Sequence, residues 1–342
     1  MIKPFLLLLL SIFILSSCGD HFITDKKYRD KVSKQFEKTK ELAANRKEQL
    51  FSVFDKDLSL KEKEALEFLY AYMPLNDLAD YDGDFFLKNV RSSFAARDTF
   101  SWGKTIPEDI YRHFVLPVRV NNENLDSSRW VFFDEIKDRI LHMTMKEAAL
   151  EINHWCHEKV TYKGSDGRTS SPLASVKTAY GRCGEESTFA VAALRAASIP
   201  ARQCYTPRWA HTDDNHAWVE VWVDGKWHYL GACEPDPDLD MGWFSSHVKR
   251  AMLVNTTVFG DYTGPEDVLK KEERFTQINV LQNYTKTKKI FVKVTDEKNN
   301  PADSAFVEFG LYNYAEFYPL TRAQTDDKGL CSFLTGYGDL LI

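Results

Sequence analysis

The chain has 342 residues, of which 44 % are hydrophobic and 13 % aromatic. This is enough apolar material for a sizeable core, and the length predicts two or three domains. The formal net charge is only −6 and no long basic block is present. Composition therefore excludes the strongly basic class of nucleic-acid-binding proteins, and we expect no nucleic acid as a partner.

The first residues have the pattern of an export signal. Residues 5–15 form an apolar run that is too short for a comfortable membrane span. The stretch from Leu15 to Cys18 resembles a bacterial lipobox, which implies a signal peptide at 1–17, lipidation of Cys18 and a tether at 18–27. We therefore expect a lipid-anchored protein of the bacterial cell envelope, on the periplasmic or outer-surface side. A plain secretory signal or an N-terminal anchor helix is the alternative.

Residues 28–140 are predicted to form a mainly helical region. Charge dominates residues 26–54, with sparse apolar positions, which is typical of a solvated helix that leans on a larger body. Ser59 and Glu62 have the spacing of a capping box, and Pro107 stands in the first turn of another short helix.

Residues 141–250 are expected to form the next domain. Thr144 and Glu147 open a helix by the same capping signature. Cys156 lies on the apolar face of this helix, so we assign it to packing. Residues 183–197 are apolar on nearly every side, which predicts a buried helix.

An antiparallel sheet is predicted to follow the buried helix. Residues 216–223 alternate strictly between polar or aromatic and aliphatic positions, and 226–232 return as a partner strand. Asp224 and Gly225 between them have the residue types of a type I′ turn. A helix followed by such strands predicts the α+β fold class.

The sequence pattern changes after residue 250. Residues 251–287 are expected to be a linker with irregular or β structure, and 288–342 an all-β module. This module resembles the small sandwich domains of carboxypeptidase regulatory and related surface proteins. The apolar run that ends the sequence at Ile342 leads us to expect that its last strand is missing.

Apart from Cys18, the chain has five cysteines, at positions 156, 183, 204, 233 and 331. An odd number leaves at least one thiol free or paired with another molecule. No CxxC pair is present, so a structural zinc site is not expected, and no cofactor is predicted.

Cys183 stands where the buried helix is predicted to begin. The N–H groups and the dipole of a helix start favour a thiolate and can hold an oxyanion. Gly181 and Gly184 leave room for a substrate backbone to approach. We interpret Glu185 and Glu186 as favourable charges at the helix start rather than as general bases.

The candidate base is His216, which begins the alternating strand after a polar loop. The segments YGRCGEESTFAVAALRAASIPARQ and NHAWVEVWVDGKWHYLGACEP, within about residues 145–240, resemble the catalytic core of the transglutaminase-like superfamily. The resemblance implies a papain-like fold with Cys183 as the nucleophile and His216 as the general base and acid.

The sequence departs from the family's pattern at the third catalytic residue. The family usually has an aspartate four residues after the tryptophan of the second strand, and counting from Trp227 leads to Gly231. Glu234 is our choice for the carboxylate, with Asp236 and Asn215 as alternatives. In the register set by the turn, Glu234 faces away from the histidine unless a bulge near the glycine turns it back.

The same register leaves a metal site open as another interpretation, because it places Cys233 opposite His216. Cys183, His216 and Cys233 would then be the ligands. We favour the triad over this arrangement.

The loop before His216 supplies the candidate substrate-binding residues. Trp209 and His211 of this loop, with Trp218 of the strand, are predicted to line a groove. A solvated loop with one packing tryptophan is the alternative.

The predicted function is that of a lipid-anchored thiol enzyme acting on amide or peptide bonds of a protein or peptide substrate. The acyl group of the substrate is transferred to Cys183, which forms an acyl-enzyme. The resemblance favours hydrolysis of this intermediate over cross-linking. Cross-linking of the glutamine γ-glutamyltransferase type is one alternative. A non-catalytic, lipid-anchored scaffold or binding protein is the other.

Overall fold

The computed structural model describes residues 20–164 and 167–338. The predicted signal peptide, Cys18 and the apolar end at 339–342 lie outside the described residues. Among the residues that are described, no helix combines the length and the apolar character that a membrane crossing needs.

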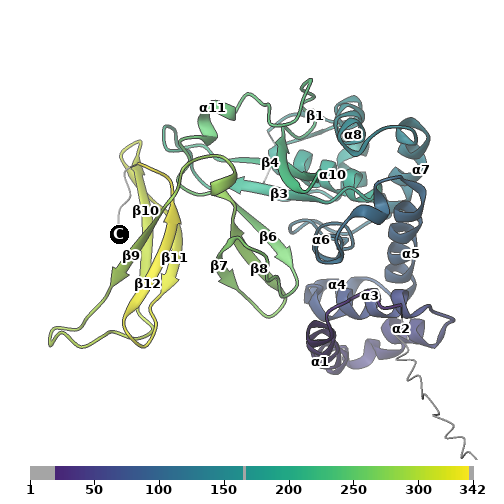
Figure 1. The fold of residues 1–342 in the computed structure, drawn as a ribbon, viewed down its shortest axis with the longest axis horizontal. Coiled ribbons are helices and arrows are strands. Elements are labelled where there is room, and N and C mark those ends of the chain that lie inside the picture. The colour runs from purple at the N-terminus through teal and green to yellow at the C-terminus, as the bar shows by residue number, and fades with distance from the viewer. Residues whose placement is uncertain (1–19, 165–166, 339–342) are drawn as a thin grey trace, which may run out of the picture.

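The chain before residue 141 forms a helical region whose purple and blue elements lie at one end of the molecule (Figure 1). Ser59 and Thr144 each form the predicted capping box, since each side chain accepts from the backbone of the glutamate three residues later. The helices are α1 (Lys26–Leu42), α2 (Lys47–Phe51), α3 (Leu60–Tyr72), α4 (Leu75–Asp80), α5 (Gly83–Thr99), α6 (Glu108–Phe114) and α7 (Ser128–Ile140), with short 3-10 turns at Ala44–Arg46, Ser52–Asp55 and Gly103–Thr105.

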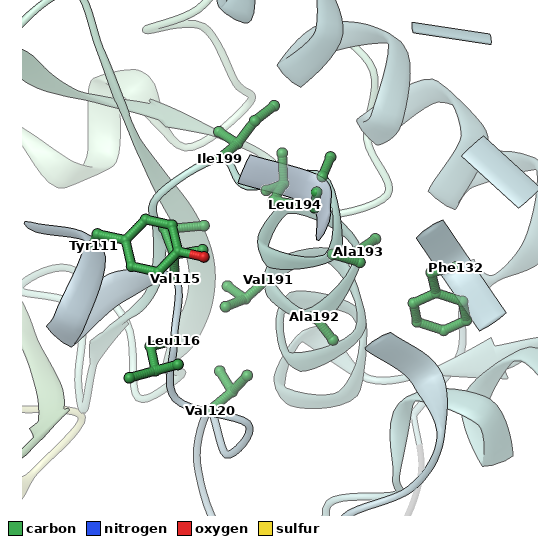
Figure 2. Packing of buried hydrophobic residues seen from close by; sticks show 14 of the residues in the cluster. Tyr111, Val115, Leu116, Val120, Phe132, Val191, Ala192, Ala193, Leu194 and Ile199 are labelled. Atoms are coloured by element: carbon green, nitrogen blue, oxygen red, sulfur yellow. The ribbon is translucent and has the colours of Figure 1, made fainter. Parts of the chain in front are cut away.

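The predicted buried helix is α10 (Cys183–Ala196), and it is the centre of the core. Figure 2 shows Val191 and Leu194 of α10 among Tyr111, Val115 and Leu116 on one side, with Phe132 of α7 on the other. Two more helices, α8 (Met145–Lys159) and α9 (Pro172–Thr178), also pack on α10, and the short parallel strands β1 (Thr161–Tyr162) and β2 (Tyr180–Gly181) lead into it.

A six-stranded sheet covers α10 through its strands β3 and β4, and the order across it is β5-β4-β3-β6-β8-β7. Asp224 and Gly225 both have positive φ, as a type I′ turn requires, and they join β4 to β5. The strands are β3 (Ala201–Thr206), β4 (His216–Val223), β5 (Lys226–Leu230), β6 (Asn255–Phe259), β7 (Asp267–Lys271) and β8 (Phe275–Asn279).

The segment 251–287 has β structure, one of the two forms expected for it, but it is not a separate linker. Tyr205 of β3 pairs with Asn255 of β6, and β6 pairs with β8 along its length. These strands therefore continue the core sheet. The sequence interpretation failed here because strand pairing between distant segments leaves little local signal.

The C-terminal module is all-β and lies at the opposite end from α1–α5 (Figure 1). Its inner faces bury Phe309 and Phe333 together with Met252 and Leu253 of the preceding segment. The strands are β9 (Lys288–Lys293), β10 (Phe306–Asn313), β11 (Glu316–Gln324) and β12 (Leu330–Thr335), paired as β9 with β12 and β10 with β11. The mixture of helical and strand regions confirms the α+β class.

Candidate active site

The start of α10 places Cys183 at the molecular surface beside the sheet. Arg182 is the N-cap residue with extended backbone (φ −79°, ψ 172°), and Glu185 accepts a hydrogen bond from its backbone N–H at 2.8 Å. Glu185 therefore has the helix-start role predicted for it. The Cys183 side chain is partly exposed, whereas the rest of the helix is buried.

The thiol of Cys183 contacts the strand that begins with His216. Helix α10 packs on β4, and the backbone N–H groups of Ala217 and Gly184 lie near the thiol and lower its pKa. His216, the residue next to Ala217, pairs with Thr206 of β3 at the end of the ladder. The predicted nucleophile and base thus lie where one helix and one strand begin, and both line the same pocket.

Aromatic rings surround His216 and hold it. Its ring centroid lies 4.7 Å from that of Trp243, 5.1 Å from that of Phe244 and 5.8 Å from that of Trp218. Its Nε2 is buried and has no hydrogen-bond partner among the described residues. Burial lowers the pKa of His216 to about 4, an effect that the charge of Asp214 partly opposes.

Burial acts on the thiol in the opposite direction. It raises the pKa of Cys183, while the N–H of Ala217 and the charge of Arg182 reduce the rise. In the resting protein the pair is therefore a neutral thiol and a neutral imidazole. A neutral imidazole can accept the thiol proton during attack, so this state is suited to general-base activation.

Cys183 lies between two pockets. One has a volume of about 520 Å³ and is lined by His216, Glu186, Glu234 and Trp243, among others. The other has a volume of about 510 Å³ and is lined mainly by side-chain amides and hydroxyls. The two share Arg182, Cys183, Asn215 and Ala217. Together they form a groove that crosses the thiol, as a chain-like substrate requires.

Residues 124–232 match the sequence model of the transglutaminase-like superfamily. The chain carries a transglutaminase-like domain. The matched range contains Cys183 and His216, begins before α7 and ends just before Glu234. It starts earlier than the boundary at 141 expected from the sequence, because α7 packs on α10 and belongs to the same core.

A search of curated proteins finds no match. Among solved structures, a proposed cysteine protease from Cytophaga hutchinsonii, determined to 1.9 Å, aligns with 19 % sequence identity and a TM-score of 0.25. The alignment covers 46 % of this chain and 64 % of that protein, so less than two thirds of the other protein's length is matched.

Glu234 takes the space that a side chain at position 231 would occupy in the transglutaminase-like domain. β5 ends at Leu230, and the chain makes a tight turn in which the N–H of Glu234 donates to the carbonyl of Gly231 at 3.3 Å. A Cβ atom at position 231 would lie 2.5 Å from Oε2 of Glu234. The turn, with Cys233 at φ 57°, thus returns the carboxylate to the pocket in place of the expected bulge.

Trp243 lies between the carboxylate of Glu234 and the ring of His216 and contacts both. Nε1 of Trp243 donates to both carboxylate oxygens, at 3.2 and 3.1 Å, and the Trp243 ring packs on His216. No direct hydrogen bond joins Glu234 to His216 in the part of the chain that is described. The role of Glu234 as the third catalytic residue stays a prediction. Asp236 does not line the pocket, whereas Asn215 does.

Helix α8 fixes the turn that carries Glu234. Nδ2 of Asn153 donates to the carbonyls of Gly231 (2.8 Å) and Glu234 (3.1 Å), and its Oδ1 accepts from the N–H of Cys233 (2.9 Å). His157, one helical turn later, contacts the carbonyl of Cys233 through Nδ1 at 2.9 Å. The sequence analysis did not single out Asn153, whose only signal was a polar residue on an apolar helix face.

Cys233 is not available as a metal ligand. Its thiol is buried, forms a hydrogen bond with the Cys156 thiol and lies 3.9 Å from the carbonyl oxygen of Glu186. No group of three or more His, Cys, Asp or Glu side chains within 20–164 and 167–338 is arranged to hold a metal ion. The left-handed turn sends the Cys233 side chain into the core, so Cys233 does not line the pocket with Cys183 and His216.

The tryptophans predicted to contact substrate support the histidine instead. Trp209 is 3 % exposed and Trp218 0 %, and their rings stack 6.2 Å apart with an interplanar angle of 7°. Neither is among the described residues that line the two pockets. The correction follows from β4, which directs the Trp218 side chain into a second core cluster. His211 stacks on His247 at 4.7 Å and also lies outside the pocket linings.

The C-terminal module holds the loop that precedes His216. Asn313, at the end of β10, accepts from Nε of Arg208 at 2.7 Å and donates through Nδ2 to the carbonyls of Trp209 (2.8 Å) and Thr212 (2.9 Å). Arg208 is buried and also pairs with Glu316 at 3.0 Å. A module outside the transglutaminase-like domain thus contributes to the order of the loop that precedes His216.

Proposed function

We propose that the protein is a thiol enzyme that cleaves amide or peptide bonds through an acyl-enzyme on Cys183. The observation that carries the proposal is the pocket in which the Cys183 thiol, the His216 imidazole and the Glu234 carboxyl come together at the start of a buried helix. Within a transglutaminase-like domain, this set of groups supports a cysteine-based enzyme.

The reaction follows from these groups. The sulfur of Cys183 attacks the carbonyl carbon while its proton passes to the imidazole of His216, and the oxyanion lies near the backbone N–H groups at the start of α10. The imidazolium then gives its proton to the leaving amine as the C–N bond breaks. Water attacks the thioester with His216 as the base and releases the acid and the thiol. Glu234 keeps the imidazole oriented through Trp243.

We favour hydrolysis over cross-linking on the sequence resemblance, and the partial exposure of Cys183 lets water reach it. Cross-linking would replace water by an amine with the same residues in the same roles. We propose that the enzyme acts at the bacterial envelope, held there through Cys18, on the basis of the lipobox-like sequence.

The non-catalytic alternative has one observation in its favour: the raised pKa of Cys183, which keeps the resting thiol protonated. It predicts a thiol of ordinary reactivity and a protein that turns over no amide.

The test uses the soluble form that begins after Cys18, incubated with a peptide mixture and a labelled primary amine. Mass spectrometry separates cleavage, deamidation and amine incorporation. We expect cleavage or deamidation with the wild-type protein and neither with the matched Cys183→Ala variant. Amine incorporation as the main product would establish cross-linking, and no conversion of any kind would support the scaffold.

A further inference from the structure

The two pockets beside Cys183 differ in charge. The pocket on the His216 side, which we call the acidic pocket, includes Glu186, Asp214 and Glu234 in its lining. The pocket on the other side, which we call the amide pocket, includes Gln203 and Asn255. Among the described residues that line the amide pocket there is no carboxylate. Arg182 contributes a positive charge to both. The groove therefore offers different chemistry on the two sides of the reacting carbonyl.

Glu186 is the most unusual residue of the acidic pocket. It lies three residues after Cys183 on α10, and only 3 % of its surface is exposed. No hydrogen bond or ion pair reaches its carboxyl group from the residues that the structure describes. Burial, together with the charges of Glu234 and Glu185, raises its pKa to about 8. The Glu186 carboxyl lines the pocket without a protein partner among the described residues, so a ligand in the pocket can satisfy it.

The neighbouring polar groups have partners of their own. Nε of Arg182 lies 3.7 Å from the carboxylate of Glu185, and its Nη2 donates to the carbonyl of Gly167 at 3.1 Å. Glu234 accepts from the indole of Trp243. A cation that keeps the Glu186 carboxyl ionised must therefore come from outside this set of residues.

The shape of the acidic pocket favours an organic cation over a metal ion. Its volume is about 520 Å³, and its carboxylates do not converge into a group that could hold a metal among the described residues. A primary ammonium group has three donors and a compact charge, which suits carboxylates separated across a pocket.

We propose that the acidic pocket binds a primary ammonium group of the substrate, with Glu186 as its buried partner, next to the carbonyl that Cys183 attacks. The amide pocket then takes a neutral polar part of the same substrate. This inference rests on the proposed function and narrows its substrate class to amides or peptides that carry an ammonium group on the His216 side.

The first experiment compares three thiol reagents of similar size at about pH 8.5, above the pKa of Glu186, and at low salt. They are 2-aminoethyl, methyl and 2-sulfonatoethyl methanethiosulfonate, which are cationic, neutral and anionic. In each case the Cys183 thiolate attacks the sulfenyl sulfur, a mixed disulfide forms and methanesulfinate leaves. The Cys331→Ser background removes the partly exposed thiol of the C-terminal module.

We expect the ratio of the reaction rates of the cationic and neutral reagents to be about tenfold higher for the folded protein than for the unfolded protein, because a negative charge lies near the thiol. Glu186→Gln should remove most of this preference. The matched control is Asp213→Asn, which changes an exposed carboxylate of the nearby loop that does not line the pocket. A ratio equal to that of the unfolded protein, or one unchanged by Glu186→Gln, would overturn the proposal. Glu234→Gln is the second variant if Glu186→Gln does not fold.

The second measurement does not depend on the thiol. Ethylammonium chloride should raise the unfolding temperature of Cys183→Ala above that in sodium chloride of equal ionic strength, because a ligand of the native state stabilises it. The double variant Cys183→Ala/Glu186→Gln should lose the difference. Equal unfolding temperatures in the two salts would contradict the ammonium site. A thiol that does not react with the neutral reagent would contradict the proposed function alone.

Discussion

The two halves of the candidate active site are built in different ways. The nucleophile half, residues 180–187, is one continuous stretch in which an N-cap, a helix start and the Glu185 side chain determine the position of Cys183. The histidine half consists of residues 207–218 and 231–244, and it depends on contacts from α8 and from the end of β10. Helix starts are stabilised by neighbours in sequence, whereas the orientation of a strand-end histidine needs partners from distant segments.

This difference predicts how substitutions in each half affect the fold and the activity. Changes in the nucleophile half should remove chemistry without altering the fold. Substitutions in the histidine half should lower activity by displacing His216. The loss of activity should be smaller for residues that lie farther from His216.

The largest effect is expected in the nucleophile half. Cys183→Ala should reduce turnover by at least about a thousandfold, because no other group can form the acyl-enzyme. Turnover of the product found with the peptide mixture measures this, and a thermal melt shows that the fold is kept. Cys331→Ser, which changes a thiol in the C-terminal module, is the control. Appreciable turnover by Cys183→Ala would refute the mechanism.

The next effect tests the carboxylate of the histidine half. Glu234→Gln should reduce turnover by roughly a hundredfold to ten thousandfold if the charge orients His216 through Trp243. Asp236→Asn, two residues later and outside the pocket lining, should have little effect. The opposite pattern, with a normal Glu234→Gln and a severely impaired Asp236→Asn, would transfer the role to Asp236.

A smaller effect is expected from the module outside the transglutaminase-like domain. Asn313→Ala removes three hydrogen bonds to the loop before His216 and should cost about 1–3 kcal/mol of local order. We expect a kcat lower by about tenfold and faster proteolysis within residues 207–215. Glu308→Gln, in an exposed ion pair with Arg322 on the same hairpin, is the matched control. Equal proteolysis of Asn313→Ala and wild type would show that the loop is ordered without the module.

The last prediction concerns pH and compares the two halves directly. Burial raises the pKa of Cys183 and lowers that of His216 to about 4, so between these values both groups are neutral. Alkylation of Cys183 by iodoacetamide requires the thiolate and should therefore rise about tenfold per pH unit from about pH 6 to about pH 9. A plateau in this range would instead indicate a preformed thiolate–imidazolium pair.

Much of the nucleophile half could be predicted because its signals are local. The apolar run of α10 and the position of Cys183 at its start follow from the properties of a few adjacent residues, and so does the type I′ turn at Asp224 and Gly225, which lies outside this half. The interpretation of Glu186 was incomplete for the same reason. A helix-start charge and a pocket-lining carboxylate look identical in sequence, and only the packing of α10 against the sheet separates them.

The sequence by itself determined the α+β class, the helix that begins at Cys183 and the strand that begins at His216, since backbone hydrogen bonding and alternation act over short distances. Only the tertiary structure decided the rest. It placed Glu234 over Gly231 through a turn held by Asn153, and it joined β6 to the core sheet. These features depend on hydrogen bonds between segments that are far apart in the chain, and no short pattern of residues records them.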